Sequence, residues 1–137
     1  MAEMRGRCLC GAVRWVSEGP VLWAGHCHCD SCRRATGAAV NSFFGVPRGS
    51  VRWSGEMRQR VSSQGRMVRK FCGKCGSHMT CEYDGWPDEA HLYAASLEDA
   101  AQFEPRAHFH WAEKLDWVVF DDDLPKYPGS ADTTEPI

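Results

Sequence analysis

The sequence predicts a mainly β fold in a single small domain. Short runs rich in β-branched and aromatic residues recur along the chain, and Gly or Pro lies near most of their ends. The 13 glycines and 7 prolines distribute turns through all 137 residues, whereas stretches with helical character are scarce. A chain of this length can bury one hydrophobic core. We therefore expect a small β-barrel or sandwich.

Seven runs are predicted as strands: 12–18, 21–27, 40–46, 51–53, 67–71, 78–83 and 90–97. Two short helices are expected, one over 30–36 with Asp30 as its N-cap and one over 97–103. No repeat or linker interrupts the chain before its end. The segment 129–137 is rich in Gly, Ser, Thr and Pro and is predicted to be a flexible tail, which leaves 1–128 as the domain.

Seven of the eight cysteines fall into three clusters that have the spacing of metal ligands. The clusters are Cys8-x-Cys10, Cys27-His28-Cys29-x-x-Cys32 and Cys72-x-x-Cys75. In an extended segment, residues two apart point to the same side of the backbone, and a C-x-x-C turn also brings its two thiols together. Each cluster can therefore present its thiolates to one ion, and zinc is the metal that four such ligands fit best.

The three clusters predict two different zinc sites. The first and third, Cys8, Cys10, Cys72 and Cys75, supply four thiolates and make a plausible closed, structural site. The middle cluster, Cys27, Cys29 and Cys32, supplies only three. Three protein ligands with one open position are the arrangement that catalytic zinc sites use.

Other uses of the cysteines stay open at this point. Four disulfides would absorb all eight, but bridges across C-x-C and C-x-x-C are strained. A redox dithiol is possible at either C-x-x-C, and four cysteines also suit iron. Cys81 is either a small buried side chain in a strand or a fourth ligand that would close the middle site.

Composition excludes several classes of protein. The formal net charge of -2 argues against general nucleic-acid binding. No apolar run reaches the roughly 18 residues of a membrane span, and residues 1–10 lack the apolar core of a secretion signal, so a reducing cytoplasm is expected. The basic run that contains Arg58, Arg60 and Arg66 is interpreted as a solvated strand pair. Arg33, Arg34, Arg69 and Lys70 adjoin cysteine clusters in sequence, where they could guide a small anionic substrate.

Histidines and aromatic residues are expected mainly in structural roles. His28 lies between two predicted ligands, so in an extended segment it points away from the metal and is expected to support the site or pack behind it. His26 is placed to hydrogen-bond a metal-bound thiolate. The larger aromatic residues are assigned to the core: Trp15, Trp23, Phe43, Phe44, Trp53 and Trp117. One of Phe43 and Phe44 must face the other side of its strand, towards a pocket or a partner.

In these motifs the chain resembles the glutathione-dependent formaldehyde-activating enzyme family, which also includes centromere protein V-like domains. The resemblance rests on CLCGAV at 8–13, HCHCDSCRRATG at 26–37 and FCGKCGS at 71–77. It continues through Leu-Glu-Asp at 97–99, Pro105, His108, Trp117 and Asp-Leu-Pro at 123–125, and so covers nearly the whole chain.

The resemblance implies a β-rich domain of the β-tent type that carries two zinc ions. Carried over, the structural zinc falls on Cys8, Cys10, Cys72 and Cys75, and the catalytic zinc on Cys27, Cys29 and Cys32. It further implies a carbon-sulfur lyase that joins glutathione, as co-substrate, to formaldehyde to give S-hydroxymethylglutathione. Arg33 and Arg34, which adjoin the middle cluster, are the expected glutathione contacts. The competing hypothesis is a non-catalytic binding module in which both zinc ions are structural.

Overall fold

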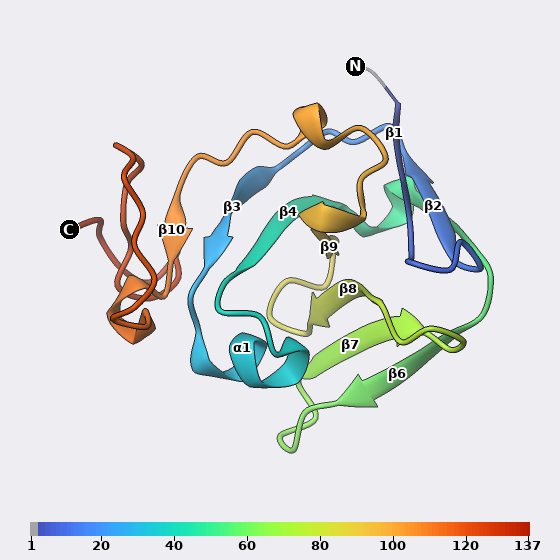
Figure 1. Ribbon diagram of the computed structural model, residues 1–137, viewed down its shortest axis with the longest axis horizontal. Coiled ribbons are helices and arrows are strands. Elements are labelled where there is room, and N and C mark those ends of the chain that lie inside the picture. The colour runs from blue at the N-terminus through green and yellow to red at the C-terminus, as the bar shows by residue number, and fades with distance from the viewer. Residues whose placement is uncertain (1–2) are drawn as a thin grey trace. The chain divides into compact units, whose positions relative to one another are not determined.

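Strands make up most of the regular structure, so the predicted mainly β class is confirmed. The computed structural model describes residues 3–137 (Figure 1). Its strands are β1 Met4–Arg7, β2 Arg14–Ser17, β3 Trp23–Cys27, β4 Asn41–Pro47, β5 Val51–Ser54, β6 Met57–Val61, β7 Met67–Cys72, β8 His78–Tyr83, β9 Glu89–Tyr93 and β10 His108–Phe109. The α-helix is α1 Asp30–Thr36, and short 3-10 turns are η1 Arg48–Ser50, η2 Ala94–Ser96, η3 Ala100–Gln102 and η4 Trp111–Glu113.

Two predicted elements end differently in the structure. The strand expected over 90–97 stops at Tyr93, because the chain then turns through η2. The helix expected over 97–103 is reduced to the single 3-10 turn η3, where the Asp99 carboxylate accepts a hydrogen bond from the Ala101 N–H. In both cases a tight turn replaces a regular element, and such short 3-10 turns are hard to predict from local composition.

The chain forms two compact units, and unit 1 holds the described residues up to Trp23 together with Phe44–Phe103. It contains a three-stranded sheet in the order β1-β2-β5. The indole of Trp15 in β2 is buried, and its Nε1 donates to Ser96 Oγ at 3.0 Å. A Cβ on Gly6 would lie 2.1 Å from Trp15 Nε1, so only glycine lets β1 pack against this ring.

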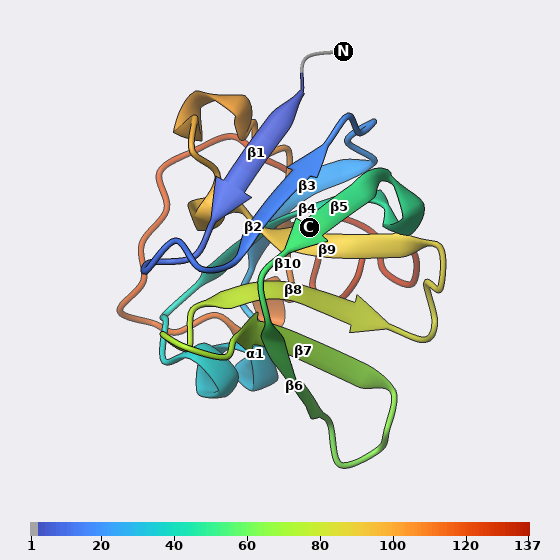
Figure 2. The same cartoon turned by 90° about the vertical axis from the view of Figure 1, so that its right-hand side faces the viewer.

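A second antiparallel group in unit 1 has the order β9-β8-β7-β6, and Figure 2 shows β8, β7 and β6 side by side. Strand β6 is the edge, and Arg58 and Arg60 point from it into solvent. These two arginines are solvated as predicted, whereas Arg69 and Lys70 of the same basic run lie in β7 and are half-buried. Charged side chains on an edge strand oppose pairing with another chain.

Unit 2 holds Ala24–Phe43 and Glu104–Ile137. Here β10 pairs with β3 in parallel, with His108 opposite His26 and Phe109 opposite Cys27 (Figure 1). Gly25 is required at this crossing, because a Cβ would lie 2.5 Å from the Ala107 carbonyl oxygen. The pairing brings a segment from the end of the chain beside the middle cysteine cluster.

The C-terminal segment of unit 2 returns to the rest of that unit by backbone hydrogen bonds. The His110 N–H donates to the Gly129 carbonyl at 2.9 Å, and the Ile137 N–H donates to the Lys126 carbonyl at 2.8 Å. A domain boundary at residue 128 stays a prediction. Among residues 3–137, no helix has the length and apolar character needed to cross a bilayer.

Candidate metal centres

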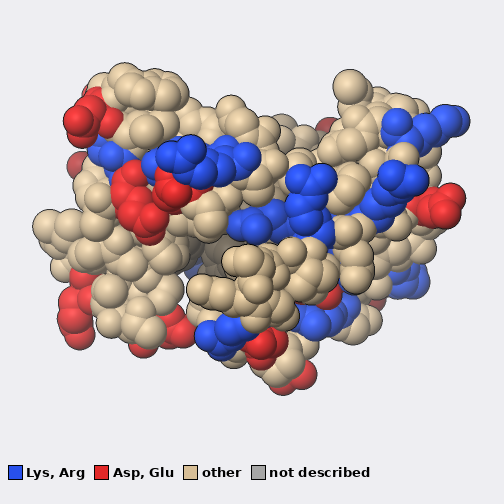
Figure 3. All heavy atoms as spheres, turned by 90° about the horizontal axis from the view of Figure 1, so that it is seen from below, with Lys and Arg blue, Asp and Glu red and all other residues tan. Residues whose placement is uncertain are grey.

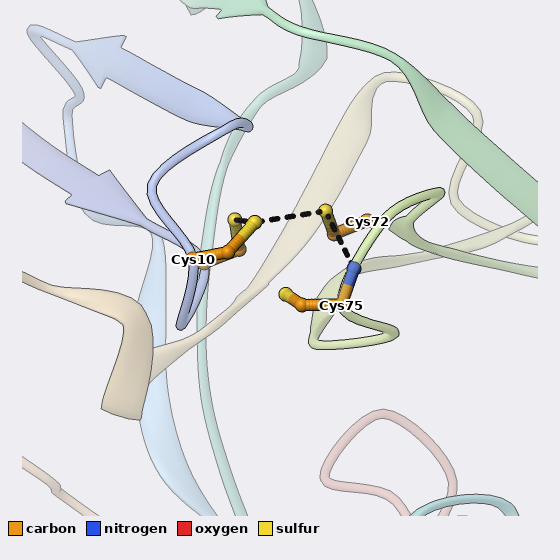
Figure 4. A group of neighbouring side chains, drawn as sticks. Cys10, Cys72 and Cys75 are labelled. Atoms are coloured by element: carbon orange, nitrogen blue, oxygen red, sulfur yellow. Dashed lines mark hydrogen bonds between the residues drawn. The ribbon is translucent and has the colours of Figure 1, made fainter.

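The first and third cysteine clusters come together in unit 1 as one group of four thiols. The Sγ atoms of Cys8, Cys10, Cys72 and Cys75 all lie within 4.8 Å of one another. Cys8 Sγ is 3.6 Å from Cys10 Sγ, and Cys10 Sγ is 3.8 Å from Cys72 Sγ (Figure 4). Four sulfurs bound at about 2.3 Å to a tetrahedral ion stand about 3.8 Å apart. The spacing therefore fits a metal and is far too long for disulfides.

Two similar turns build this group. After Cys10 and after Cys75 the chain passes through a glycine with positive φ, Gly11 at 81° and Gly76 at 80°. Each turn closes back on its first cysteine, because the Gly11 N–H donates to the Cys8 carbonyl and the Gly76 N–H to the Cys72 carbonyl. The positive φ after each pair of cysteines therefore explains why glycine occupies that position.

Backbone amides in these turns also point at the sulfurs. Val13 N–H donates to Cys8 Sγ at 3.3 Å, and the N–H groups of Lys74 and Cys75 donate to Cys72 Sγ at 3.3 Å. The Ser77 hydroxyl lies 3.1 Å from Cys75 Sγ and lowers the pKa of Cys75 to about 5. Donors of this kind stabilise thiolates, the form in which cysteine binds metal.

The middle cluster gathers three thiols in unit 2. Cys27 ends β3, Cys29 caps α1 and Cys32 lies in the first turn of the helix, and their Sγ atoms lie within 4.8 Å of one another. Hydrogen bonds from the thiols of Cys27 and Cys32 hold the pKa of Cys29 far below its usual range, and the same contacts raise the pKa of Cys27. Three donors of this type could hold one tetrahedral ion and leave one vertex for another ligand.

The cap of α1 corrects one sequence prediction. Asp30 was expected as the N-cap, but the cap is Cys29, whose Sγ accepts from the Cys32 N–H at 3.3 Å. Asp30 is the first helical residue, where its carboxylate favours the positive end of the helix. The capping position is thus occupied by a candidate ligand, which ties the start of the helix to the thiol cluster.

Cys81 takes the simpler of its two expected roles. Its side chain is buried in β8, and its Sγ lies 3.0 Å from Met67 Sδ. Among residues 3–137 it belongs to neither thiol group. The prediction that Cys81 acts as a small buried side chain is therefore supported by its surroundings.

The two arginines after Cys32 differ in their surroundings. The Arg33 side chain is 15% exposed, and its Nη1 donates to the carbonyl oxygens of His28 and Glu113. The Arg34 side chain is 80% exposed, and its Nε donates to the Asp30 carboxylate at 2.9 Å. Arg33 thus holds the backbone around the middle cluster, whereas the guanidinium of Arg34 faces solvent.

A cleft of about 230 Å³ opens beside α1 in unit 2. It is lined by Asp30, Arg33, Arg34, Gly37, Ala38, Ala39, Leu115 and Trp117. Trp117 was predicted to lie in the core, but its side chain is 72% exposed, since the segment that carries it has no regular structure to bury it. Trp15, Phe43 and Phe44 are buried, as predicted. The expectation that one of the two Phe side chains faces a pocket or a partner is wrong, because neither reaches the surface.

Charges of both signs share the surface. Figure 3 shows Lys and Arg side chains beside Asp and Glu side chains on one face of the molecule. Around the cleft this mixture takes the form of the Arg33–Asp30 and Arg34–Asp30 ion pairs. The cleft therefore offers both cationic groups and an exposed indole to a ligand.

A chain of three side chains, which the sequence did not reveal, lies behind the middle cluster. His28 Nε2 is 2.8 Å from His108 Nδ1, and His108 Nε2 is 2.9 Å from Asp122 Oδ2. Burial and the neighbouring His108 lower the pKa of His28 to about 4. His26 Nδ1 lies 2.8 Å from Ser42 Oγ, and its contact with a thiolate stays a prediction. The parallel pairing of β10 with β3 brings His108 beside His28, and the bridge between His108 and Lys126 brings Asp122 beside His108.

Comparison with known proteins assigns the family. A sequence model described as glutathione-dependent formaldehyde-activating enzyme matches residues 3–113, which include all three cysteine clusters. The chain belongs to this family. The resemblance found from the three motifs is thereby confirmed.

Two similar proteins show how far the sequence and the structure of this family member differ from those of known proteins. A protein of Halomonas elongata, provisionally named a glutathione-dependent formaldehyde-activating enzyme, is 30% identical over 129 residues, covering 84% of this chain and 79% of the relative. A crystal structure of a Rhodobacter sphaeroides protein is 27% identical and matches with a TM-score of 0.57, covering 70% of this chain and 89% of that one.

Proposed function

We propose that the protein is a zinc-dependent enzyme of the carbon-sulfur lyase type that acts on an adduct of a small thiol and a small aldehyde. Glutathione and formaldehyde, which give S-hydroxymethylglutathione, are the first candidates. The observation that carries this proposal is the middle cluster, where three thiols within 4.8 Å of one another leave a metal one vertex open. Membership of the family supports the choice of substrates.

The two thiol groups take different roles in this proposal. Cys8, Cys10, Cys72 and Cys75 hold a structural zinc, because four thiolates fill a tetrahedral ion and leave no position for a substrate. Cys27, Cys29 and Cys32 hold the second zinc, which supplies a site where a thiol is kept as thiolate or a carbonyl is polarised.

The reaction itself needs little chemical assistance from the protein. The thiol sulfur forms a bond to the aldehyde carbon, the carbon-oxygen π bond breaks, and the thiol proton passes to the oxygen through solvent, so neither oxidant nor reductant is needed. Holding both reactants beside one another can supply several kcal/mol of the barrier reduction. The chain contributes a rigid cluster, fixed by the end of β3, the cap of α1 and the Arg33 hydrogen bonds.

A rate measurement tests the proposal. Zinc-loaded protein is expected to accelerate the exchange between free formaldehyde and S-hydroxymethylglutathione, measured by exchange NMR, above the uncatalysed rate in the same buffer. The Cys29→Ser variant should return the rate to that background, because it removes one of three ligands. If loaded wild-type protein gives no acceleration with any small thiol tested, the chain is a binding module and not an enzyme.

The cleft beside α1 is proposed as the place where the thiol's peptide portion lies. Arg34 can pair with a glutathione carboxylate, and Trp117 can cover an apolar part of the peptide. Of the two arginines proposed as contacts, Arg34 is the stronger candidate, because Arg33 already donates to two backbone carbonyls.

Substitutions at the cleft are expected to raise KM for glutathione and leave kcat nearly unchanged. An exposed ion pair contributes up to about 1 kcal/mol, so Arg34→Ala should raise KM about 2- to 5-fold. Trp117→Ala removes a larger contact and should raise KM about 10-fold. Arg52→Ala and Val61→Ala, which change exposed residues of unit 1, are the matched controls. Unchanged KM in both cleft variants would remove the cleft from the proposal.

A further inference from the structure

The hydrogen-bonded chain from Asp122 to His28 is built into unit 2 with little freedom. His28 and His108 are both fully buried. The rings of Trp111 and Phe120 pack edge-on against His108, with centroids 4.8 and 4.6 Å from its centroid. The His108 N–H donates to the Pro125 carbonyl, and its own carbonyl accepts from the Tyr127 N–H. Both imidazoles are therefore held in place by main chain and by packing.

The carboxylate at one end of this chain fixes where each proton lies. Burial raises the pKa of Asp122, but hydrogen bonds from His108 and from the Leu124 N–H together with nearby charges lower it below its usual value, so Asp122 is an ionised acceptor. His108 Nε2 must then carry a hydrogen. In a neutral ring Nδ1 is left as an acceptor, and it takes the hydrogen of His28 Nε2 at 2.8 Å. His28 is thus the Nε2–H tautomer, with a lone pair on Nδ1.

His28 is also the residue between two of the three thiols. Its N–H donates to the Phe109 carbonyl at 3.0 Å, and its carbonyl accepts from Arg33. Its Nδ1 is buried and has no hydrogen-bond donor among the described residues. The main chain of this residue is fixed on both sides, and the ring is fixed by His108. A rotation of the ring would break its contact with His108.

We propose that Asp122 and His108 are positioning residues that lock the tautomer and orientation of His28 and thereby hold the thiols of Cys27 and Cys29 in a geometry ready for metal. The inference rests on the proposed metal site, but it does not depend on catalysis. Groups that hydrogen-bond metal ligands typically change metal affinity about 10- to 100-fold when they are removed, and we expect the same range for groups that hold the residue between two ligands. Through His108, the partly exposed carboxylate of Asp122 thus influences the buried loop that holds the thiols of Cys27 and Cys29.

The decisive variant is Asp122→Asn, which keeps the size of the side chain but can donate as well as accept. The matched control is Asp123→Asn, an identical change at the exposed neighbouring residue. Heteronuclear NMR of isotope-labelled histidine should report His28 as a single Nε2–H tautomer in wild type and in Asp123→Asn. In Asp122→Asn the His28 signals should shift to a mixture of tautomers, because the amide no longer dictates the proton on His108.

Metal affinity gives the second measurement. In cadmium NMR, four-sulfur and three-sulfur sites give separate resonances, so chelator competition can be followed at each group. Asp122→Asn should weaken the three-thiol site about 10- to 100-fold and leave the four-thiol site unchanged. A wild-type His28 in the Nδ1–H form would overturn the proposal without any variant being needed. Equal weakening by Asp123→Asn, or an unchanged three-thiol site in folded Asp122→Asn, would also overturn it.

Discussion

Cys10→Ser and Cys75→Ser are expected to give unfolded or insoluble protein, whereas Cys29→Ser should remain folded. Metal binding contributes on the order of 10 kcal/mol or more in small zinc domains, which equals or exceeds the usual net stability of a domain. The four-thiol group joins the turn at Cys10 to the turn at Cys75, two parts of unit 1 that are far apart in the sequence. Loss of one ligand there removes the link between two distant parts of the chain.

The three-thiol group predicts a different response. Its cysteines lie within six consecutive positions, at the end of β3 and the start of α1. A metal there closes only a short loop, and β3, β10 and α1 are also held by backbone hydrogen bonds. Cys29→Ser should therefore lose one metal and its activity but keep the circular dichroism spectrum of the wild type.

Metal analysis and thermal unfolding together check this contrast. Wild-type protein purified without chelator should carry about two zinc ions per chain. Cys81→Ala is the control, because it removes a buried thiol that belongs to neither group and should keep both ions. Equal collapse of Cys10→Ser, Cys75→Ser and Cys29→Ser would contradict distinct roles and favour two structural sites.

The parts of the fold that the sequence predicted well are those with strong local patterns. The strand at 78–83 and the helix at 30–36 have the expected bounds, and 67–71 is short by one residue. Strands β1 and β6 were not predicted. Each is an edge strand that pairs with a neighbour on one side only, and each carries two arginines, so its sequence lacks the apolar pattern of a strand. Edge position depends on tertiary pairing and is invisible in a local window.

The candidate site shows the same division. Spacing alone grouped the cysteines, because a C-x-C or C-x-x-C segment places its thiols together whatever the rest of the chain does. The link from Asp122 to His28 could not be found this way, since it depends on the two-residue parallel pairing between β10 and β3 and on the bridge between His108 and Lys126. The exposure of Trp117 was likewise unpredictable, because an aromatic residue in an irregular segment is buried only if another element covers it.

Glutathione is expected to bind the three-thiol site of zinc-loaded protein with release of one proton, and to bind more tightly as pH rises. A thiol must lose its proton to ligate zinc, and free thiols have a pKa of about 8.5. Below that value each unit of pH should strengthen binding about 10-fold, and the gain should end near the thiol pKa. Added salt should weaken binding if Arg34 pairs with a carboxylate of the peptide.

Calorimetry in buffers of different ionisation enthalpy measures the proton directly, because the apparent binding enthalpy then varies with the buffer. S-methylglutathione is the control, since it keeps the peptide and both carboxylates but cannot form a thiolate. Its binding should be weak, independent of pH in this range and free of proton release. In the Cys29→Ser variant, glutathione should likewise bind weakly, independently of pH in this range and without proton release. Equal binding of the two peptides without proton release would eliminate thiol ligation and leave activation of the aldehyde as the role of the open vertex.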